Sequence, residues 1–348
     1  MRNVLFLYTE IAPYFLACCR ELVQTKNVKV HVVRYPVNNE APFLFGEKEN
    51  DIVFYDRKNY SANQLAKLVK DISPAVIICS GWIDKDYLAI CKQYYKKVPT
   101  VLTLDTHWRG DMKQRVATWV APFYLHKRFS HVWVPGHIQK DYALRLGFKD
   151  EQIRLGFYSA DVEHFSLLYD KINEKKREQF PKRLIYIGRY YEFKGVTHLW
   201  KAFAEIQEET PNEWELWCLG TGDLKPMEHP KIKHFGFVQP AEMLRYVKDT
   251  GVFVMPSLFE PWGVVLHEFA VMGFPLVVSD KVGAAEVFLK NGANGYSYSA
   301  GKEEALKEKL KTIMSLTAEQ LTLMGSESRK LAFSITPQKW ADTVVSFI

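Results

Sequence analysis

The sequence has few cysteines and no long uncharged apolar run. Its five cysteines among 348 residues are odd in number and form no C-x-x-C pair. We therefore expect free, buried thiols in a reducing compartment rather than a disulfide framework. Glu10 and Pro13 interrupt the apolar N-terminal stretch, which predicts a buried first strand instead of a signal peptide or membrane span. These absences favour a cytoplasmic protein.

Acidic side chains are scarce in the first half of the chain. In residues 1–180, 27 basic minus 20 acidic side chains gives +7, whereas 19 minus 20 in the remainder gives −1. An excess of positive charge suits an anionic partner such as phosphate, nucleic acid or an acidic membrane surface. The aromatic content (22 Phe, 18 Tyr and 9 Trp) suits either sugar stacking or a large core.

Short apolar runs alternate with helix-period segments along most of the chain. Continuous β-branched runs are typical of strands buried on both faces, so the pattern predicts parallel sheets in an α/β protein. The predicted strands are 4–8, 28–33, 52–55, 75–79, 100–104, 132–134, 184–188, 215–219, 231–235, 252–255 and 275–279. Helices are expected over 61–71 and 84–95, over the tail from Thr317, and in a last helix with Pro337 in its first turn.

The alternation fails once, near the middle of the chain, where charged residues crowd together between 168 and 183. We predict a solvated linker over 166–183 that joins two Rossmann-like, doubly wound domains, 1–165 and 184–330. A terminal helix within 331–348 is expected to cross back to the first domain. Because ligands of open α/β sheets bind at the carboxyl ends of the strands, we expect the domains to face a central cleft.

The segment 255–280 is almost wholly apolar but contains Glu260, His267 and Glu268. Carboxylates in such surroundings need a partner or a function. Pro261 suits the first turn of a helix, which would place Glu260 at its start and Glu268 about two turns in. Gly263 would let a phosphate approach the N–H groups of the helix N-terminus. The alternative is that Glu260 caps the helix and Glu268 forms a salt bridge.

A second motif follows the predicted strand 184–188. Gly188 begins a turn that carries the cations Arg189 and Lys194 to a helix, an arrangement suited to a diphosphate but also found in ordinary strand–helix turns. Gly220, in Gly-Thr-Gly after the next strand, is a weaker signal of the same kind.

Together, G-R-x4-K-G and the E-x7-E segment from Glu260 to Glu268 resemble the retaining family-4 glycosyltransferases (glycosyl transferases group 1), which have the GT-B fold. The resemblance covers residues 184–298, including the Phe237–Val238 turn. It implies that Arg189 and Lys194 bind the diphosphate of a nucleotide-sugar, that Glu268 binds the ribose, and that Glu260 contacts the sugar. It also implies that the N–H groups of Gly263, Val264 and Val265 bind phosphate or sugar oxygens, while Phe237 and Val238 frame the base.

The resemblance implies no metal and no cofactor beyond the UDP- or GDP-linked sugar donor. The single D-x-D sequence, Asp84-Lys85-Asp86, lies at the start of a predicted helix, where Asp84 is expected to be the N-cap.

The first half matches this family only in its strand–helix rhythm. Where many members have a Gly-Gly loop after the first strand, this chain has Thr9-Glu10-Ile11-Ala12-Pro13. A catalytic histidine of the family corresponds to Asp105 in strict register, or to His107 after a slip of two residues; either would lie at the carboxyl end of a strand. Both could instead be structural.

No acidic residue lies between Asp111 and Asp141, and the helix-period segment within this interval is basic. Val116, Trp119, Val120, Phe123 and Tyr124 fall on one helical face. Such a face either packs into the core or lies on an anionic membrane.

The patterns together predict a retaining, metal-independent glycosyltransferase of the hexosyltransferase type. It would transfer a sugar to a glycan or lipid-linked acceptor in cell-surface polysaccharide biosynthesis, from the cytoplasm or as a peripheral protein on the inner face of the membrane. The alternatives are a nucleotide-sugar epimerase or phosphorylase of the same fold, or a non-catalytic protein that binds an anionic ligand.

Overall fold

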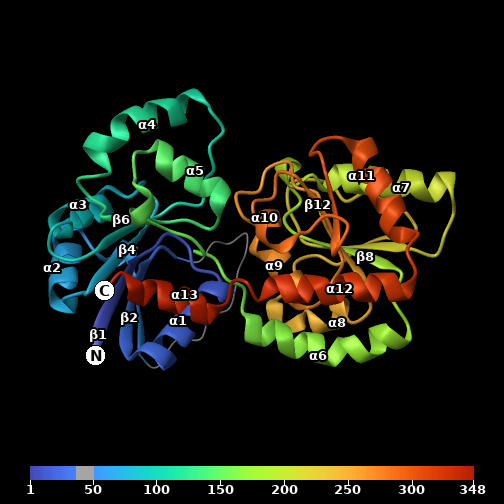
Figure 1. Ribbon diagram of the computed structural model, residues 1–348, viewed down its shortest axis with the longest axis horizontal. Helices are drawn as coiled ribbons and strands as arrows, with labels where there is room; N and C mark the ends of the chain where they lie inside the picture. Colours follow the sequence, from blue (N-terminus) through green and yellow to red (C-terminus); the bar gives the residue numbers. More distant parts are fainter. Residues whose placement is uncertain (37–50) are drawn as a thin grey trace. The chain divides into compact units, whose positions relative to one another are not determined.

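The computed structural model describes residues 1–36 and 51–348 and divides into two compact units (Figure 1). Unit 1 comprises Met1–Asp161 together with Ile335–Ile348, and unit 2 comprises Val162–Ser334. Each unit contains one parallel sheet. The α/β class and the two Rossmann-like domains predicted from the sequence are confirmed.

Unit 1 is built on a seven-stranded sheet with the order β3-β2-β1-β4-β5-β6-β7. The order reverses between β1 and β4, and this is the switch point at which open α/β sheets bind ligands. The strands are β1 (Arg2–Leu7), β2 (Val28–Arg34), β3 (Ile52–Asp56), β4 (Val76–Ser80), β5 (Thr100–Thr103), β6 (His131–Trp133) and β7 (Ile153–Arg154).

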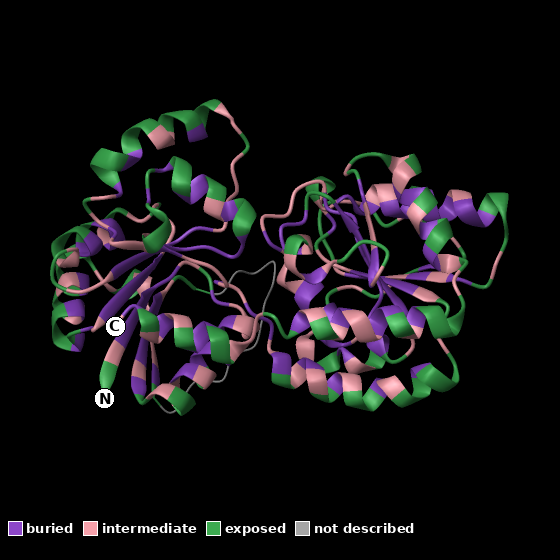
Figure 2. Ribbon diagram, in the orientation of Figure 1, coloured by how far each residue is buried: buried purple, intermediate pink, exposed green. Residues whose placement is uncertain are grey.

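Helices cover both faces of this sheet, and its central strands are almost wholly buried, whereas the edge strand β3 is mostly half-buried (Figure 2). Because side chains alternate along a strand, Leu5 packs on one face and Phe6 on the other. The Leu5 face is covered by α2 (Ala62–Ile72), α3 (Lys85–Tyr94), α4 (Met112–Tyr124) and α5 (His137–Arg145). The Phe6 face is covered by α1 (Pro13–Lys26) and α13 (Pro337–Ser346).

Unit 2 is built on a six-stranded sheet with the order β10-β9-β8-β11-β12-β13. The strands are β8 (Arg183–Ile187), β9 (Glu215–Leu219), β10 (Ile232–His234), β11 (Val252–Met255), β12 (Leu276–Ser279) and β13 (Gly295–Tyr298). The helices are α6 (Val162–Glu178), α7 (Val196–Glu209), α8 (Leu244–Val247), α9 (Val264–Val271), α10 (Ala285–Phe288), α11 (Glu303–Met314) and α12 (Ala318–Ala332). On one face α7 and α11 pack over the core, while α6, α9 and α12 pack against one another.

All eleven strands predicted from the sequence are present, within about two residues at each end. The strands β7 and β13 were not predicted; they are only two and four residues long and lie at the edges of their sheets. An edge strand this short lacks the continuous apolar run that identified the others.

The predicted linker is wrong, because Val162–Glu178 forms the helix α6. Phe165, Leu168 and Ile172 are buried at helical spacing, so one face of α6 packs on the rest of unit 2. Its other charged side chains face solvent, but Lys176 is buried on this face beside the Phe274 ring. Because this segment contains many charged residues, its narrow apolar stripe was not recognised in the sequence.

The terminal helix crosses back to unit 1, as predicted, and packs against α1. Trp340 anchors it: the indole stacks on Phe6 with ring centroids 5.7 Å apart, and its N–H donates to the Phe157 carbonyl over 2.9 Å. Pro337 begins this helix, and Thr336 caps it.

All five cysteines are buried and free, as expected. Within the part of the chain that the structure describes, every helix is too short or too polar to cross a membrane.

Candidate active site

The two motifs of unit 2 meet in an ion pair between Lys194 and Glu260. Lys194 ends a 3₁₀ turn, Glu192–Lys194, in the loop after β8, and Glu260 lies in the loop after β11. Their side chains are only 17% and 13% exposed. The main chains also join, because the Leu258 N–H donates to the Phe193 carbonyl over 2.8 Å. Two predicted site residues that lie 66 positions apart are therefore in direct contact.

Gly195 allows this close approach of the two loops. Its φ of +66° lies in the left-handed region, and a Cβ there would fall 2.0 Å from the Pro256 carbonyl oxygen. A larger residue would have to separate the loops and, with them, Lys194 from Glu260.

Three further loops lie together at the carboxyl ends of β8, β9 and β10. The Gly188 N–H donates to the Leu219 carbonyl over 3.0 Å, and the Gly220 N–H donates to the Gly236 carbonyl over 2.7 Å. These hydrogen bonds bring Gly188, Gly220 and the Phe237–Val238 turn together at the carboxyl ends of the strands. Arg189 is exposed, and its guanidinium carbon lies 5.3 Å from the centre of the Tyr191 ring.

The helix after Glu260 begins later than predicted. Pro261 is not in its first turn, because α9 starts at Val264 after Gly263, whose φ is +94°. The intervening residues pair with the loop after β12: the Glu260 N–H donates to the Lys281 carbonyl over 3.0 Å, and the Gly283 N–H donates to the Glu260 carbonyl over 3.1 Å. This bridge holds the segment extended. Glu268 is consequently the fifth residue of α9, not two turns in.

The start of α9 is nevertheless suited to an anion. Gly263 is the N-cap, and Val264 and Val265 are the first two helical residues. The N–H groups at these positions have no acceptor within a helix, and the helix dipole adds partial positive charge there. Gly263 also has no side chain to keep a ligand from the backbone.

His267 is part of the core of unit 2 rather than of a binding surface. It is fully buried, its ring stacks on Phe288 with centroids 4.1 Å apart, and its Nε2 lies 2.9 Å from the Ala332 carbonyl oxygen. Burial lowers the pKa of His267 to about 4, so the ring is neutral. Glu268, the next residue, is half-buried and lies on another side of the helix.

Unit 1 has a cavity of about 670 Å³ at its switch point. It is formed by the segments that follow β1, β4 and β5, with side chains from α4 along one side. Asp105 lines it and accepts a hydrogen bond from the Tyr158 hydroxyl over 3.1 Å. Burial and the neighbouring Asp105 hold the pKa of Tyr158 well above its usual value, so this hydroxyl remains a donor.

The structure distinguishes the placement of Asp105 from that of His107. Asp105 lies two residues after the end of β5 on the cavity wall, whereas His107 is not among the described residues that line the cavity. The His107 carbonyl accepts a hydrogen bond from the Gln114 side chain over 2.8 Å, which ties its loop to α4.

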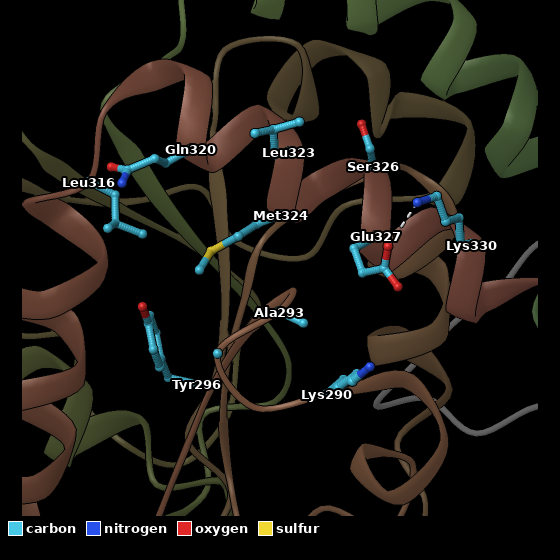
Figure 3. A pocket seen from close by; sticks show the side chains of 11 residues that line it. Lys290, Ala293, Tyr296, Leu316, Gln320, Leu323, Met324, Ser326, Glu327 and Lys330 are labelled. Atoms are coloured by element: carbon cyan, nitrogen blue, oxygen red, sulfur yellow. Dashed lines mark hydrogen bonds and ion pairs between the residues drawn. The ribbon is translucent and has the colours of Figure 1, made fainter.

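A second cavity, of about 680 Å³, lies on unit 2 between α12 and residues 290–296 (Figure 3). Glu327 and Lys330 form an ion pair at its edge, Met324 points into it from the same helix, and Leu323 is also among its lining residues. None of its lining residues belongs to the two motifs. We therefore place the candidate site at the motifs and not at this cavity.

The Asp84-Lys85-Asp86 sequence is structural. Asp84 caps α3 by accepting from the Asp86 and Tyr87 N–H groups, as predicted, and the carboxylates of Asp84 and Asp86 both pair with Arg57. The described residues outside 37–50 contain no group of three His, Cys, Asp or Glu side chains placed to hold a metal ion.

Comparison with known proteins matches part of the chain to a family. Residues 181–315 match the model of the family "Glycosyl transferases group 1", and this range contains every predicted site residue of unit 2. An uncharacterized glycosyltransferase of Methanocaldococcus jannaschii is 30% identical over 36% of this chain and 35% of that protein. Spore coat protein SA of Bacillus subtilis is 28% identical over 84% of this chain and 83% of that protein.

The fold agrees along the whole chain. The crystal structure of Anabaena HepE, solved in complexes with UDP and with UDP-glucose, superposes with a TM-score of 0.72 at 16% identity and covers both chains completely. Residues 181–315 thus match the group 1 glycosyltransferases, and the chain as a whole has the GT-B fold. The family that the motif order suggested from the sequence is the one that matches residues 181–315, and the M. jannaschii match covers only about a third of either protein.

Several residues that line the switch-point cavity of unit 1 were not predicted. Tyr158 and Tyr8 line it from segments that gave no motif, and Arg109 and Trp82 come from loops. Some of these residues stand just after a predicted strand end and others stand far from one, so their positions in the sequence do not mark them as cavity residues. A tyrosine brought in from residue 158 has no local pattern that would link it to Asp105.

Proposed function

We propose that this protein transfers a sugar from a nucleotide-diphosphate sugar to an acceptor with retention of anomeric configuration and without a metal ion. The contact between Lys194 and Glu260 carries the proposal, because it joins a cation suited to the diphosphate with a carboxylate suited to the sugar. Unit 2 would bind the donor and unit 1 the acceptor, a glycan or lipid-linked glycan of cell-surface polysaccharide biosynthesis.

The donor diphosphate would be held by Arg189, Lys194 and the first N–H groups of α9. Breaking the glycosidic bond leaves negative charge on the diphosphate and positive charge on the sugar. Two fixed cations and a helix N-terminus stabilise the first of these charges without a metal ion. Lys194 pairs with Glu260 in the unliganded protein, and the phosphate would compete for this cation.

Glu260 would contact the donor sugar. Its carboxylate is held on a segment fixed by the hydrogen bonds to Lys281 and Gly283, which is the rigid support that charge stabilisation needs. Glu268 would bind the ribose hydroxyls, and the Phe237–Val238 turn would frame the base. The Anabaena protein solved with UDP and UDP-glucose supports a UDP-linked donor.

In unit 1, Asp105 is our candidate for the acceptor side of the reaction. Its place on the wall of the switch-point cavity, with Tyr158 donating to it, suits the binding of a hydroxyl group. His107 remains the alternative that the sequence suggested.

The test is release of nucleotide from a panel of UDP- and GDP-sugars by the wild type and by Glu260→Gln. The neutral amide keeps the shape but removes the charge, so we expect the rate to fall about 100-fold. Glu205→Gln is the matched control, because it removes another carboxylate from an ion pair of unit 2, that of Lys307, away from both motifs.

Undiminished nucleotide release by Glu260→Gln would contradict the assigned site. An isomerised sugar formed without acceptor would instead show an epimerase. Proton NMR of the anomeric position in the transfer product would test retention directly.

A further inference from the structure

Helix α4 of unit 1 has its apolar face turned toward solvent. The outer face of α4 consists of Met112, Val116, Trp119, Val120, Phe123 and Tyr124. The Trp119 and Phe123 side chains are 77% and 69% exposed, and Met112 is 74% exposed. Figure 2 shows most of this helix as exposed. The core-packing alternative for this stripe, raised from the sequence, is therefore wrong.

The opposite face of α4 explains why the apolar residues are outside. Gln114, Ala117 and Ala121 pack toward unit 1, with Gln114 and Ala121 buried and Ala117 against the core. These side chains are small or polar, and successive positions turn by about 100°, so the outer face lies on the far side of the helix. A helix that serves only to cover a sheet has the reverse arrangement.

Positive charge flanks the outer face. Lys113 and Arg115 are exposed on its two sides, and Lys127 is exposed just beyond its end. Residues 112–140 contain five Lys or Arg and no Asp or Glu. Asp111, at the start of the helix, is engaged: it accepts from the Gln114 N–H over 2.9 Å and pairs with Arg109 over 3.0 Å.

We propose that the outer face of α4 docks on an anionic lipid bilayer. A Trp, Phe and Met face with cations on both flanks matches the acyl and headgroup layers of such a surface. The charge complementarity selects lipid over a second copy of this basic face, because two copies would bring like charges together. This inference concerns binding alone and does not depend on the proposed reaction.

Because α4 also lines the switch-point cavity, docking of α4 would place that cavity close to the bilayer. Gln114 and Ala117 on its inner side line the switch-point cavity of unit 1, and the flanking Lys113 stands at the margin of the same cavity. One helix thus lies between the cavity and the proposed bilayer, which suits an acceptor whose polar head enters the cavity while its apolar part stays in the membrane. This consequence rests on the proposed function.

The experiment is co-sedimentation of the full chain with vesicles of phosphatidylcholine alone or of phosphatidylcholine with phosphatidylglycerol. We expect binding only to the anionic vesicles, weakened by salt. Trp119→Gln with Phe123→Gln should lower the partition coefficient at least about tenfold. Lys113→Gln with Arg115→Gln should lower it roughly fivefold per cation removed. Leu323→Gln, at an apolar side chain 64% exposed on α12, is the matched control and should bind like the wild type.

Three outcomes would overturn the proposal: no binding to anionic vesicles, equal binding to neutral vesicles, or unchanged binding by the Trp119 and Phe123 variant. Light scattering after size-exclusion chromatography tests whether a second copy of the chain binds the outer face of α4 instead. A dimer that Trp119→Gln with Phe123→Gln converts to a monomer would assign the face to a second copy instead. Because these readouts are independent of catalysis, loss of sugar transfer in Glu260→Gln leaves them unchanged.

Discussion

At the scale of single residues, His267 shows how a polar side chain can serve the fold alone. It is fully buried and neutral, with its pKa lowered by burial to about 4 against an ordinary 6.5. The unfolded chain therefore takes up a proton between pH 6.5 and 4 that the folded chain does not. Stability is lost as the pH falls through this window, by about 3 kcal/mol at its end.

We predict that His267→Leu reduces this acid-induced loss. Thermal unfolding measured at pH 6.5 and pH 4 should show a smaller difference in Tm for the variant, although the lost hydrogen bond to Ala332 lowers its Tm at both. His137→Gln, at an exposed position of α5, is the control and should retain the wild-type difference. An undiminished difference in His267→Leu would show that other groups cause the pH dependence.

The sequence identified Lys194 and Glu260 separately, but not their contact. Each belongs to a local motif of fixed spacing, and local spacing is visible in a sequence. Their pairing depends on the Gly195 backbone meeting Pro256 across two loops, which only the folded chain brings together. For the same reason, the sequence did not show that Tyr158 is the hydrogen-bond partner of Asp105.

At the scale of elements, the central strands were predictable and the helix boundaries were less so. A strand buried on both faces is a continuous apolar run, and these runs are too short and too rich in β-branched residues to predict buried helices. The start of α9 was missed because Pro261 suits both a first helical turn and the extended bridge that Glu260 forms with Val282. Tertiary pairing decided between them.

Helix α6 was not predicted because of its many charged residues, and its orientation can be tested directly. Leu168 is buried against unit 2, whereas its neighbour Leu167 is 56% exposed. We predict that Leu168→Ala lowers the free energy of unfolding by about 2–4 kcal/mol, and that Leu167→Ala changes it by less than about 0.5 kcal/mol. Denaturant unfolding measures both. Equal effects of the two substitutions would contradict the orientation of the helix.

At the scale of the whole molecule, the chain begins and ends in the same unit. The α13 helix returns to unit 1 and buries Trp340 against Phe6 and Trp133, so this unit is completed only when the last residues are in place. The two motifs that we propose bind the donor lie wholly in unit 2. Under the proposed function, a core substitution near Trp340 changes the stability of unit 1, and a bound nucleotide changes the stability of unit 2.

We predict that Trp340→Ala destabilises unit 1 by about 3–5 kcal/mol, since it removes a large buried ring and the hydrogen bond to Phe157. In calorimetry of the full chain this lowers one transition, and added UDP raises the other, because a ligand stabilises only the unit that binds it. Gln338→Ala, on the exposed side of α13, should leave both transitions in place. A single transition that Trp340→Ala and UDP shift together would mean that the two units unfold as one, and a UDP shift confined to the lowered transition would move the donor site to unit 1.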